Sequence, residues 1–210
     1  MSFELQSFAD FCAALASSDP SPGGGTGSAA AGAVGASLVS MVIALTLSKE
    51  KYREAEADLA PVAAEAEHAG RRLRDLMRED AEAYDGMVAA RKLPKESDAE
   101  KEQRRIAMEA AARRATEIPM ETARVAGGLL SRLPLVAEKG NPNASSDAGV
   151  AALLLAAAAE GALLNVGINL ASIADAGFVG AMEKETARLQ SDVERWSAQV
   201  IALVRKSFKK

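Results

Sequence analysis

The sequence contains few of the residues that form disulfides, zinc sites or aromatic cores: one cysteine, one histidine and 4% aromatic residues. Cys12 has no second cysteine with which to pair, which excludes an internal disulfide and a thiolate metal site. A single thiol is typical of proteins of the reducing cytosol. His68 is the only histidine, so we expect no metal site, and no turn typical of a serine nucleophile lies near it.

Signals for several other classes of protein are also absent. The formal net charge is −4 and the basic residues form no stripe, which argues against nucleic acid as a partner. There is no HExxH, EF-hand or P-loop motif, and no strand precedes the glycines at 23–25, so they are not a dinucleotide fingerprint. The first residues carry acids where a signal peptide has Lys or Arg, so we expect a cytoplasmic protein.

The sequence is instead rich in long helical patterns. Residues 1–210 are enough for one domain with a substantial core, and no segment has the character of a strand. The predicted fold class is therefore all-α, a bundle of long helices. Pro61 and Pro119 fall inside two of these helices; Pro61 is expected to bend or split its helix, and Pro119 to kink a helix that continues beyond it.

Two runs of the chain are almost free of charge, residues 26–47 and residues 140–175. A run of this length is compatible with a transmembrane helix. Alanine, glycine and serine supply little transfer energy, however, and no aromatic belt or flanking basic pattern is present, which favours buried core helices. Small residues recur at four-residue steps and let another backbone or a flat ligand come near: Gly23, Gly27, Ala31 and Gly35, with Ser28 and Gly32 beside them.

Several helix ends are marked in the sequence. Ser2 is expected to cap a short N-terminal helix, and Ser97 with Glu100 has the spacing of a capping box. Gly140 follows a lysine and is expected to end a helix with a left-handed turn. The polar residues 145–147 are expected to cap the next helix with their side chains.

Polar residues inside the apolar helices are candidates for a site. Asp147, Asn165 and Asn169 share one narrow sector of a helix that begins near residue 147. Each unpaired buried amide costs about 1–3 kcal/mol, so these side chains either bond neighbouring helices or line a pocket. Asp80 lies in an apolar seam that runs from Tyr52 to Met87, and it is either an ion-paired structural acid or a site acid.

The remaining charges have simpler interpretations. His68 lies off the seam and is expected to be solvated. The acids and arginines between residues 71 and 82 are expected to form an ordinary charged outer face. The apolar surface of two uncharged helices and two heptad-like seams is larger than one thin bundle can bury. We therefore expect a two-fold homodimer that associates through its helices.

The polar residues that remain offer carboxylate, amide, hydroxyl and lysine chemistry. Such a set suits proton transfer on a polar heterocycle with an anionic tail. The candidates are Asp80, Asp147, Asn141, Asn143, Asn165, Asn169, Ser146, Lys49, Lys51, Tyr52 and Lys139.

Five segments, in this order, resemble the cyclodeaminase/cyclohydrolase family of folate enzymes: PSPGGGTGSAAAGAVGASLVSMV, LTLSKEKY, EDAEAYDGMVAARKLPK, AEKGNPNASSDAGVAA and LLNVGINL. The resemblance covers nearly the whole chain and is weakest after Phe178. It implies an all-helical homodimer and one-carbon chemistry on tetrahydrofolate, with no metal and no cofactor beyond that substrate. Glu50 stands where family members often have a lysine.

The resemblance implies one of two reactions. Both pass through a tetrahedral carbon and need an acid/base group and negative charge near a cationic carbon. The expected carboxylate is Asp147 or Asp80. The residues expected to bind the pterin edge or to orient water are Asn141, Asn143, Asn165 and Asn169. The anionic tail is expected to be bound by Lys49, Lys51 and Lys139, and the ligand is expected to come close to the backbone at Gly23, Gly24 and Gly25. Tyr52 and Ser146 are expected to be further substrate-binding residues.

Hydrolysis of 5,10-methenyltetrahydrofolate is the favoured reaction, because the short chain has no separate transferase domain to supply a formimino substrate. Formiminotetrahydrofolate cyclodeaminase activity, with release of ammonia, is the alternative. A non-catalytic helical dimer or binding module and a small membrane protein are further alternatives. Folate binding and detergent dependence would distinguish these last two from an enzyme.

Overall fold

The computed structural model describes residues 7–208, and this part of the chain contains helices and no strand, which confirms the all-α prediction. Ser2 lies outside these residues, and Ser7 caps the first described helix. The elements are α1 (Phe8–Leu15), α2 (Gly24–Leu47), the 3-10 helix η2 (Glu50–Ala55), α3 (Glu56–Arg91), α4 (Asp98–Leu130), α5 (Leu133–Lys139), the 3-10 helix η3 (Pro142–Ala144), α6 (Ser145–Leu170) and α7 (Ala176–Ser207).

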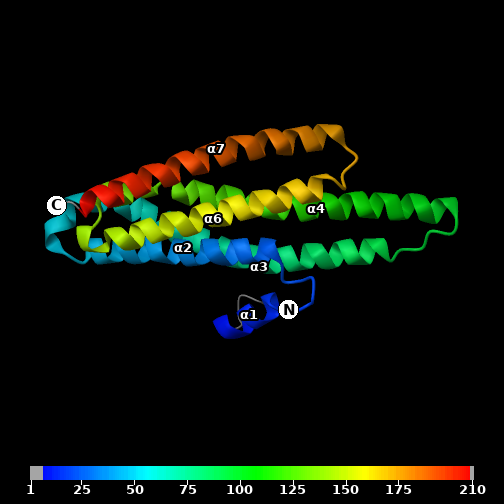
Figure 1. Cartoon of the computed structure of the whole chain (residues 1–210), viewed down its shortest axis with the longest axis horizontal. Coiled ribbons are helices and arrows are strands. Elements are labelled where there is room, and N and C mark those ends of the chain that lie inside the picture. Colours follow the sequence, from blue (N-terminus) through cyan, green and yellow to red (C-terminus); the bar gives the residue numbers. More distant parts are fainter. Residues whose placement is uncertain (1–6, 209–210) are drawn as a thin grey trace.

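Helices α2, α3, α4 and α6 form the central bundle, and their contacts are the most extensive in the molecule. Helix α7 lies along α6 and α4, while the short α1 lies on the other side of the bundle (Figure 1). The hairpin of α3 and α4 extends beyond the start of α2 at one end of the bundle (Figure 1). The start of α2 therefore lies between longer helices.

Helices α2 and α6, which are almost free of charged residues, pack against each other in antiparallel orientation. The closest approaches step along both helices, from Gly24 with Asn165 through Ser28 with Gly161 and Gly32 with Ala158 to Gly35 with Leu155. A Cβ atom on Gly35 would lie 3.0 Å from Cγ of Leu155, so small residues are required here as predicted. Gly27 has nothing within 4 Å of its would-be Cβ, so close packing does not require a small residue at that one position of the predicted pattern.

The capping box at the start of α4 is confirmed. Ser97 Oγ accepts from the backbone N–H of Glu100 at 3.3 Å, and the Glu100 carboxylate accepts from the N–H of Ser97 at 2.8 Å. The predicted left-handed turn at Gly140 is wrong, since its φ is −72°. Glycine is needed there for space, because a Cβ would lie 2.4 Å from the carbonyl oxygen of Val136.

The predicted side-chain cap of α6 is also wrong. Ser145, Ser146 and Asp147 are its first three residues, and Ala144 precedes them with no side-chain hydrogen bond. The cap belongs instead to η3, where Asn141 Oδ1 accepts from the N–H of Asn143 at 3.1 Å. Because η3 ends at Ala144, residues 145–147 lie inside the first turn of α6 and do not precede it as caps.

The prolines do not split their helices. Pro61 is the sixth residue of α3, and Pro119 lies within α4, where it is buried. Each removes one backbone bond, and both helices continue because buried neighbours such as Leu59 and Ile118 hold them in the core. The expected bends stay a prediction.

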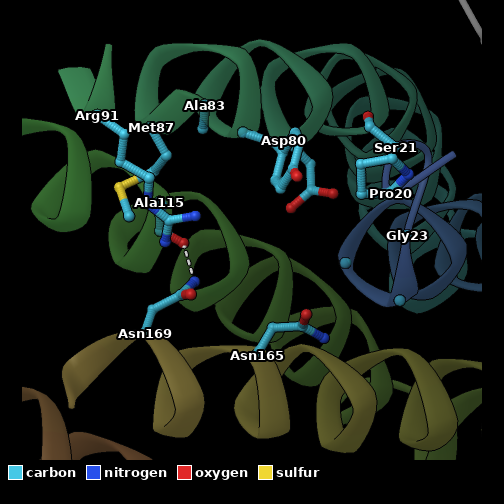
Figure 2. A pocket seen from close by; sticks show the side chains of 13 residues that line it. Pro20, Ser21, Gly23, Asp80, Ala83, Met87, Arg91, Ala115, Asn165 and Asn169 are labelled. Atoms are coloured by element: carbon cyan, nitrogen blue, oxygen red, sulfur yellow. Dashed lines mark hydrogen bonds between the residues drawn. The ribbon is translucent and has the colours of Figure 1, made fainter. Parts of the chain in front are cut away.

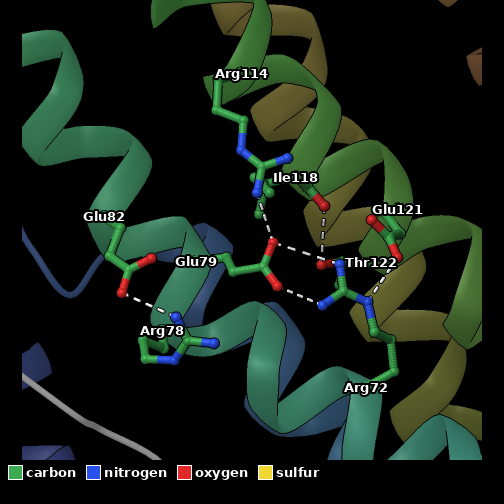
Figure 3. Close-up of polar contacts among 8 residues, drawn as sticks. All are labelled: Arg72, Arg78, Glu79, Glu82, Arg114, Ile118, Glu121 and Thr122. Atoms are coloured by element: carbon green, nitrogen blue, oxygen red, sulfur yellow. Dashed lines mark hydrogen bonds and ion pairs between the residues drawn. The ribbon is translucent and has the colours of Figure 1, made fainter.

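The charged residues of α3 are more than an ordinary outer face. Arg72 donates to Glu79 of its own helix and, at 2.6 Å, to Glu121 of α4, while Arg114 donates to Glu79 at 2.7 Å (Figure 3). The side chain of Glu79 is only 14% exposed and that of Arg72 25%. Hydrogen bonds from Arg72 lower the pKa of Glu79 and of Glu121. This network joins α3 to α4. His68 is exposed, as predicted.

Replacing Arg72 with alanine is expected to lower the free energy of unfolding by about 2 kcal/mol, because two partly buried carboxylates lose their shared donor. Arg71→Ala is the matched control. Arg71 pairs with Glu67 on the surface, where both side chains are more than 60% exposed, and its loss should change stability by less than about 0.5 kcal/mol. Urea unfolding at neutral pH measures both.

The effect of Arg72→Ala should also depend on pH. The folded-state pKa of Glu79 is lowered, so the stability from its ionised form is present above the ordinary carboxyl pKa. It is lost as the pH falls through the folded value, and the gap between wild type and Arg72→Ala should narrow on acidification. Equal urea midpoints for the Arg71 and Arg72 variants would contradict this account.

Candidate active site

A cavity of about 240 Å³ lies where α2 begins, between α3 on one side and α6 on the other (Figure 2). Helix α4 contributes only Ala115 to its wall. The lining residues are Pro20, Ser21, Gly23, Gly24, Gly25, Asp80, Ala83, Tyr84, Met87, Arg91, Ala115, Asn165 and Asn169. The cavity thus joins one carboxylate, two amides, one phenol and one guanidinium.

Asp80 projects from α3 towards the first turn of α2 (Figure 2). Thr26, which is fully buried, donates its hydroxyl to the Asp80 carboxylate at 2.7 Å, and its backbone N–H also donates. The carboxylate therefore lies at the positive end of the α2 dipole. No salt bridge within residues 7–208 includes Asp80, so the ion-pair interpretation is wrong for the described part of the chain.

The surroundings of Asp80 disfavour its charged form. Burial raises the pKa of the Asp80 carboxyl, and the two hydrogen bonds from Thr26 oppose this shift without cancelling it. A carboxyl group with a raised pKa inside a cavity is suited to accept a proton and to return it. Asp80 is consequently the strongest acid/base candidate in this pocket.

The glycines at the start of α2 make room for this carboxylate. A Cβ atom on Gly25 would lie 2.3 Å from Oδ1 of Asp80, which no side chain allows. A Cβ on Gly24 would lie 3.5 Å from the amide nitrogen of Asn165. The glycines bring the backbone close to the polar groups of α3 and α6, as expected from their small size.

The two asparagines of α6, Asn165 and Asn169, were expected either to bond neighbouring helices or to line a pocket, and the structure shows both features. Asn169 donates to the backbone carbonyl of Ala115 in α4 at 2.6 Å, which is the expected bond to a neighbouring helix. Asn165 donates to the carbonyl of Gly161 in its own helix at 2.8 Å. Both side chains nevertheless line the cavity, opposite Asp80 (Figure 2).

Tyr84 and Arg91 are pocket residues that the sequence patterns did not single out. They lie four and eleven positions after Asp80, and Met87 lies seven after it, so all four share one face of α3. This helical spacing was the signal that could have found them. Arg91 brings a cation to the cavity.

The other predicted site residues gather at the opposite end of the bundle. We call them the distal cluster: Lys49, Lys51, Tyr52, Lys139, Asn141, Asn143, Ser146 and Asp147. Tyr52 donates to Asn141 Oδ1 at 3.4 Å, and the N–H of Asn141 donates to Thr46 Oγ1 at 2.8 Å. Lys51 lies 4.6 Å from the centre of the Tyr52 ring.

The remaining members of the distal cluster are close to solvent. Lys49, Asn143 and Ser146 are exposed, and Asp147 is partly buried in the first turn of α6. Lys139 forms an ion pair with Asp58 of α3, which ties up the charge that was expected to meet a substrate tail.

The two groups of predicted residues do not form one site within a single chain. Helix α2 has 24 residues and separates them by about 35 Å at 1.5 Å per residue. Asp147 and Asn165 share a helical strip but lie about 27 Å apart along α6. The prediction that Asp147 and Asn165 lie on the same side of α6 is confirmed. The inference that they belong to one site is wrong within a single subunit.

Within residues 7–208 no three or more His, Cys, Asp and Glu side chains are grouped so as to hold a metal ion. Asp80 is the single carboxylate among the lining residues of the cavity. The described chemistry of the pocket is therefore that of one acid/base group surrounded by neutral hydrogen-bonding groups and one guanidinium.

The family model of formiminotransferase-cyclodeaminase matches residues 7–188, a region that includes the cavity and the distal cluster. The chain belongs to this family. It is 39% identical over 195 residues to a methenyltetrahydrofolate cyclohydrolase of Methylorubrum extorquens, and this match covers 93% of the chain and 94% of the relative.

Other members of the family differ in length. A formimidoyltransferase-cyclodeaminase of Gallus gallus is 33% identical over 196 residues, and the match covers 93% of this chain but 36% of that protein. The crystal structure of a formiminotetrahydrofolate cyclodeaminase from Thermotoga maritima superposes with a TM-score of 0.87 at 30% identity, covering 97% of this chain and 98% of the other. Two reaction names therefore occur among relatives of similar length, so chain length does not distinguish the two reactions.

Proposed function

We propose that this protein is a homodimeric methenyltetrahydrofolate cyclohydrolase, which converts 5,10-methenyltetrahydrofolate and water to 10-formyltetrahydrofolate. The observation that carries the proposal is Asp80, a carboxyl with a raised pKa in a cavity of amide groups. The relative that matches along nearly its whole length and carries the cyclohydrolase name supports the choice of substrate.

In the proposed reaction Asp80 first acts as a base. It accepts a proton from water while the water oxygen bonds to the cationic carbon between N5 and N10, which gives a neutral tetrahedral intermediate. The bond from this carbon to N5 then breaks as the carbinol O–H loses its proton to solvent and the C=O of the formyl group forms. Asp80 returns its proton to N5, so one water is consumed and one proton is released.

The other pocket groups have supporting roles. The ionised carboxylate of Asp80 lies near the cationic carbon and stabilises it where little water competes. Asn165 and Asn169 offer amide groups to the pterin edge or to the attacking water. Arg91 is the cation among the lining residues, and its charge suits a substrate with an anionic glutamate tail.

Formiminotetrahydrofolate cyclodeaminase activity is the second candidate, and the Thermotoga maritima structure of nearly the same length supports it. In that reaction N10 attacks a formimino carbon on N5, and ammonia leaves with a proton supplied by the same acid. The geometry of one acid/base carboxyl serves either tetrahedral intermediate.

The test is a side-by-side assay of the purified protein with both substrates. We expect loss of the methenyl absorbance well above the rate in buffer, with little ammonia from the formimino substrate. Faster ammonia release than methenyl hydrolysis would reverse the choice of reaction. Absence of both activities and of saturable folate binding would contradict the proposal and leave a non-catalytic helical module.

A further inference from the structure

The two amide groups of the cavity lie close to the end of a helix. Asn165 and Asn169 line the cavity, and α6 ends at Leu170. Helix ends fray, because their last carbonyl groups have no partner inside the helix. The place of the two amides opposite Asp80 therefore depends on what holds this end of α6.

Two charged residues of α4, Glu109 and Arg113, hold the turn that follows α6, and we call them the α4 clamp. The turn lies beside α4 (Figure 1). Glu109 Oε2 accepts from the backbone N–H of Ala174 at 3.0 Å, and its side chain is 22% exposed. Its other oxygen, Oε1, is shielded from solvent and lies 3.4 Å from Nε of Arg113. A partly buried carboxylate bonded to a backbone N–H fixes the place of that peptide group.

Arg113 extends the α4 clamp to the start of α7. It donates from Nη2 to Oδ2 of Asp175 at 2.6 Å, and its guanidinium lies 4.8 Å from the centre of the Phe178 ring. Asp175 also caps α7, because its Oδ1 accepts from the N–H groups of Gly177 and Phe178 at 2.8 and 3.0 Å. The bond from Arg113 lowers the pKa of Asp175, and the bond from the backbone lowers the pKa of Glu109, so these groups are charged at neutral pH.

The α4 clamp and the cavity share one stretch of α4. Ala115 lies two residues after Arg113, lines the cavity and accepts the hydrogen bond from Asn169 (Figure 2). Residues 109–115 thus hold both the last turn of α6 and the turn after it. Ile173 is also buried in this turn, but apolar burial is non-directional. The hydrogen bonds and ion pairs of the clamp set the direction in which α6 ends.

We propose that Glu109 and Arg113 are positioning residues of the active site. Neither lines the cavity. They act through the end of α6, which they hold so that Asn165 and Asn169 face Asp80. The inference rests on the proposed function for the identity of the ligand that the two amides bind.

Loss of the clamp should weaken substrate binding and leave the acid/base group unchanged. Asp80 is held by Thr26 of α2, on the other wall of the cavity. Arg113→Ala should therefore raise KM for 5,10-methenyltetrahydrofolate by about 10-fold, as for one or two misplaced hydrogen bonds, with a change in kcat below about 3-fold. The pH midpoint of kcat/KM, which reports Asp80, should stay in place.

Arg124→Ala is the matched control for Arg113→Ala. Arg124 also joins α4 to α7, through hydrogen bonds to Glu185 at 2.8 and 2.6 Å. The two partners are 61 residues apart, against 62 for Arg113 and Asp175. The side chain of Arg124 is 45% exposed and that of Arg113 34%. Neither Arg124 nor Glu185 lines the cavity, so a role in stability alone predicts the same kinetics for both variants.

The kinetic outcomes are distinct. A KM for Arg113→Ala that equals that of Arg124→Ala would overturn the inference. A fall confined to kcat, or a shift of the pH midpoint, would contradict it as well, because the effect would then not act through the binding amides.

A conservative variant tests the other half of the clamp. Glu109→Gln keeps an oxygen that can accept from the N–H of Ala174, whereas Glu109→Ala does not. We expect KM to stay within about 3-fold of wild type in the first variant and to rise by about 10-fold in the second. Equal KM values in these two variants would show that the bond to Ala174 does not position the site.

Amide hydrogen exchange followed by mass spectrometry tests the inference without an activity assay. In Arg113→Ala the amides of residues 166–175 should exchange at least about 10-fold faster than in wild type, whereas in Arg124→Ala they should keep the wild-type rate. Unchanged protection of this segment in Arg113→Ala would refute the role of the clamp. A wild type that converts neither folate substrate would instead contradict the proposed function, and the exchange rates would still decide whether the clamp holds the end of α6.

Discussion

Asp80→Asn is expected to lower kcat for methenyltetrahydrofolate hydrolysis by at least about 100-fold while the protein stays folded. The amide keeps the size of the side chain and its bond from Thr26, but it cannot take a proton from water or return one to N5. Circular dichroism together with a stopped-flow assay of the methenyl absorbance measures both properties.

Asp85→Asn is the control for Asp80, because Asp85 lies five residues further along α3 on an exposed position. It should keep wild-type turnover. Asp147 is the other carboxylate that the sequence suggested. Near wild-type turnover in Asp80→Asn, with loss of activity in Asp147→Asn, would transfer the acid/base role to Asp147.

The same variant should change the pH dependence. Burial raises the pKa of Asp80 in the folded protein, so wild-type kcat/KM should rise with pH around a midpoint above the ordinary carboxyl value. Between the unfolded and the folded pKa the folded protein binds more protons than the unfolded chain, so its stability falls as the pH rises through this window. Asp80→Asn has no buried carboxyl group to ionise, so it should be more stable than the wild type at neutral pH.

The second large effect is expected for Gly25→Ala. The new methyl group would lie 2.3 Å from Oδ1 of Asp80, and the carboxylate must move away from Thr26 to accommodate it. A displacement of about 1 Å at a reacting group lowers the rate by about 100-fold. We therefore expect a loss of kcat of this size with little change in helix content.

Gly86→Ala is the matched control for Gly25→Ala. Gly86 also lies inside a helix, has nothing within 4 Å of its would-be Cβ and takes no part in the pocket. Alanine there should leave activity unchanged and stabilise the helix by up to about 1 kcal/mol. Equal kinetics in the two variants would show that the space around Asp80 does not limit catalysis.

Much of the fold was predictable because local rules decide it. The capping box of Ser97 and Glu100 and the helical seam of α3 are properties of neighbouring residues, and the structure has both. The left-handed turn expected at Gly140 was wrong, because this residue has an extended backbone. The side-chain caps expected at residues 145–147 were wrong, because the short 3-10 turn Pro142–Ala144 precedes these residues and they form the first turn of α6. Such a turn depends on how the loop packs.

The candidate site was predictable in part. Asp80 was found because a carboxylate in an apolar seam costs free energy unless it is paired or has a function. The glycines at 23–25 were found because they cluster at the start of an uncharged helix. Tyr84 and Arg91 were missed although their spacing from Asp80 places them on the same face of α3. Only the start of α2 opposite Asp80 shows that this face lines a cavity. The network of Arg72 was missed because its partner Glu121 is 49 residues away.

The sequence by itself determined which residues are helical, which faces are apolar and which polar side chains interrupt those faces, since each depends on a period of 3.6 residues. Only the tertiary structure decided which of them meet. Periodicity fixes the side of a helix on which a residue lies but not its distance from the other polar groups. Asp147 therefore shares a strip with Asn165 yet lies at the far end of the bundle, while Asp80, from another helix, lies opposite it.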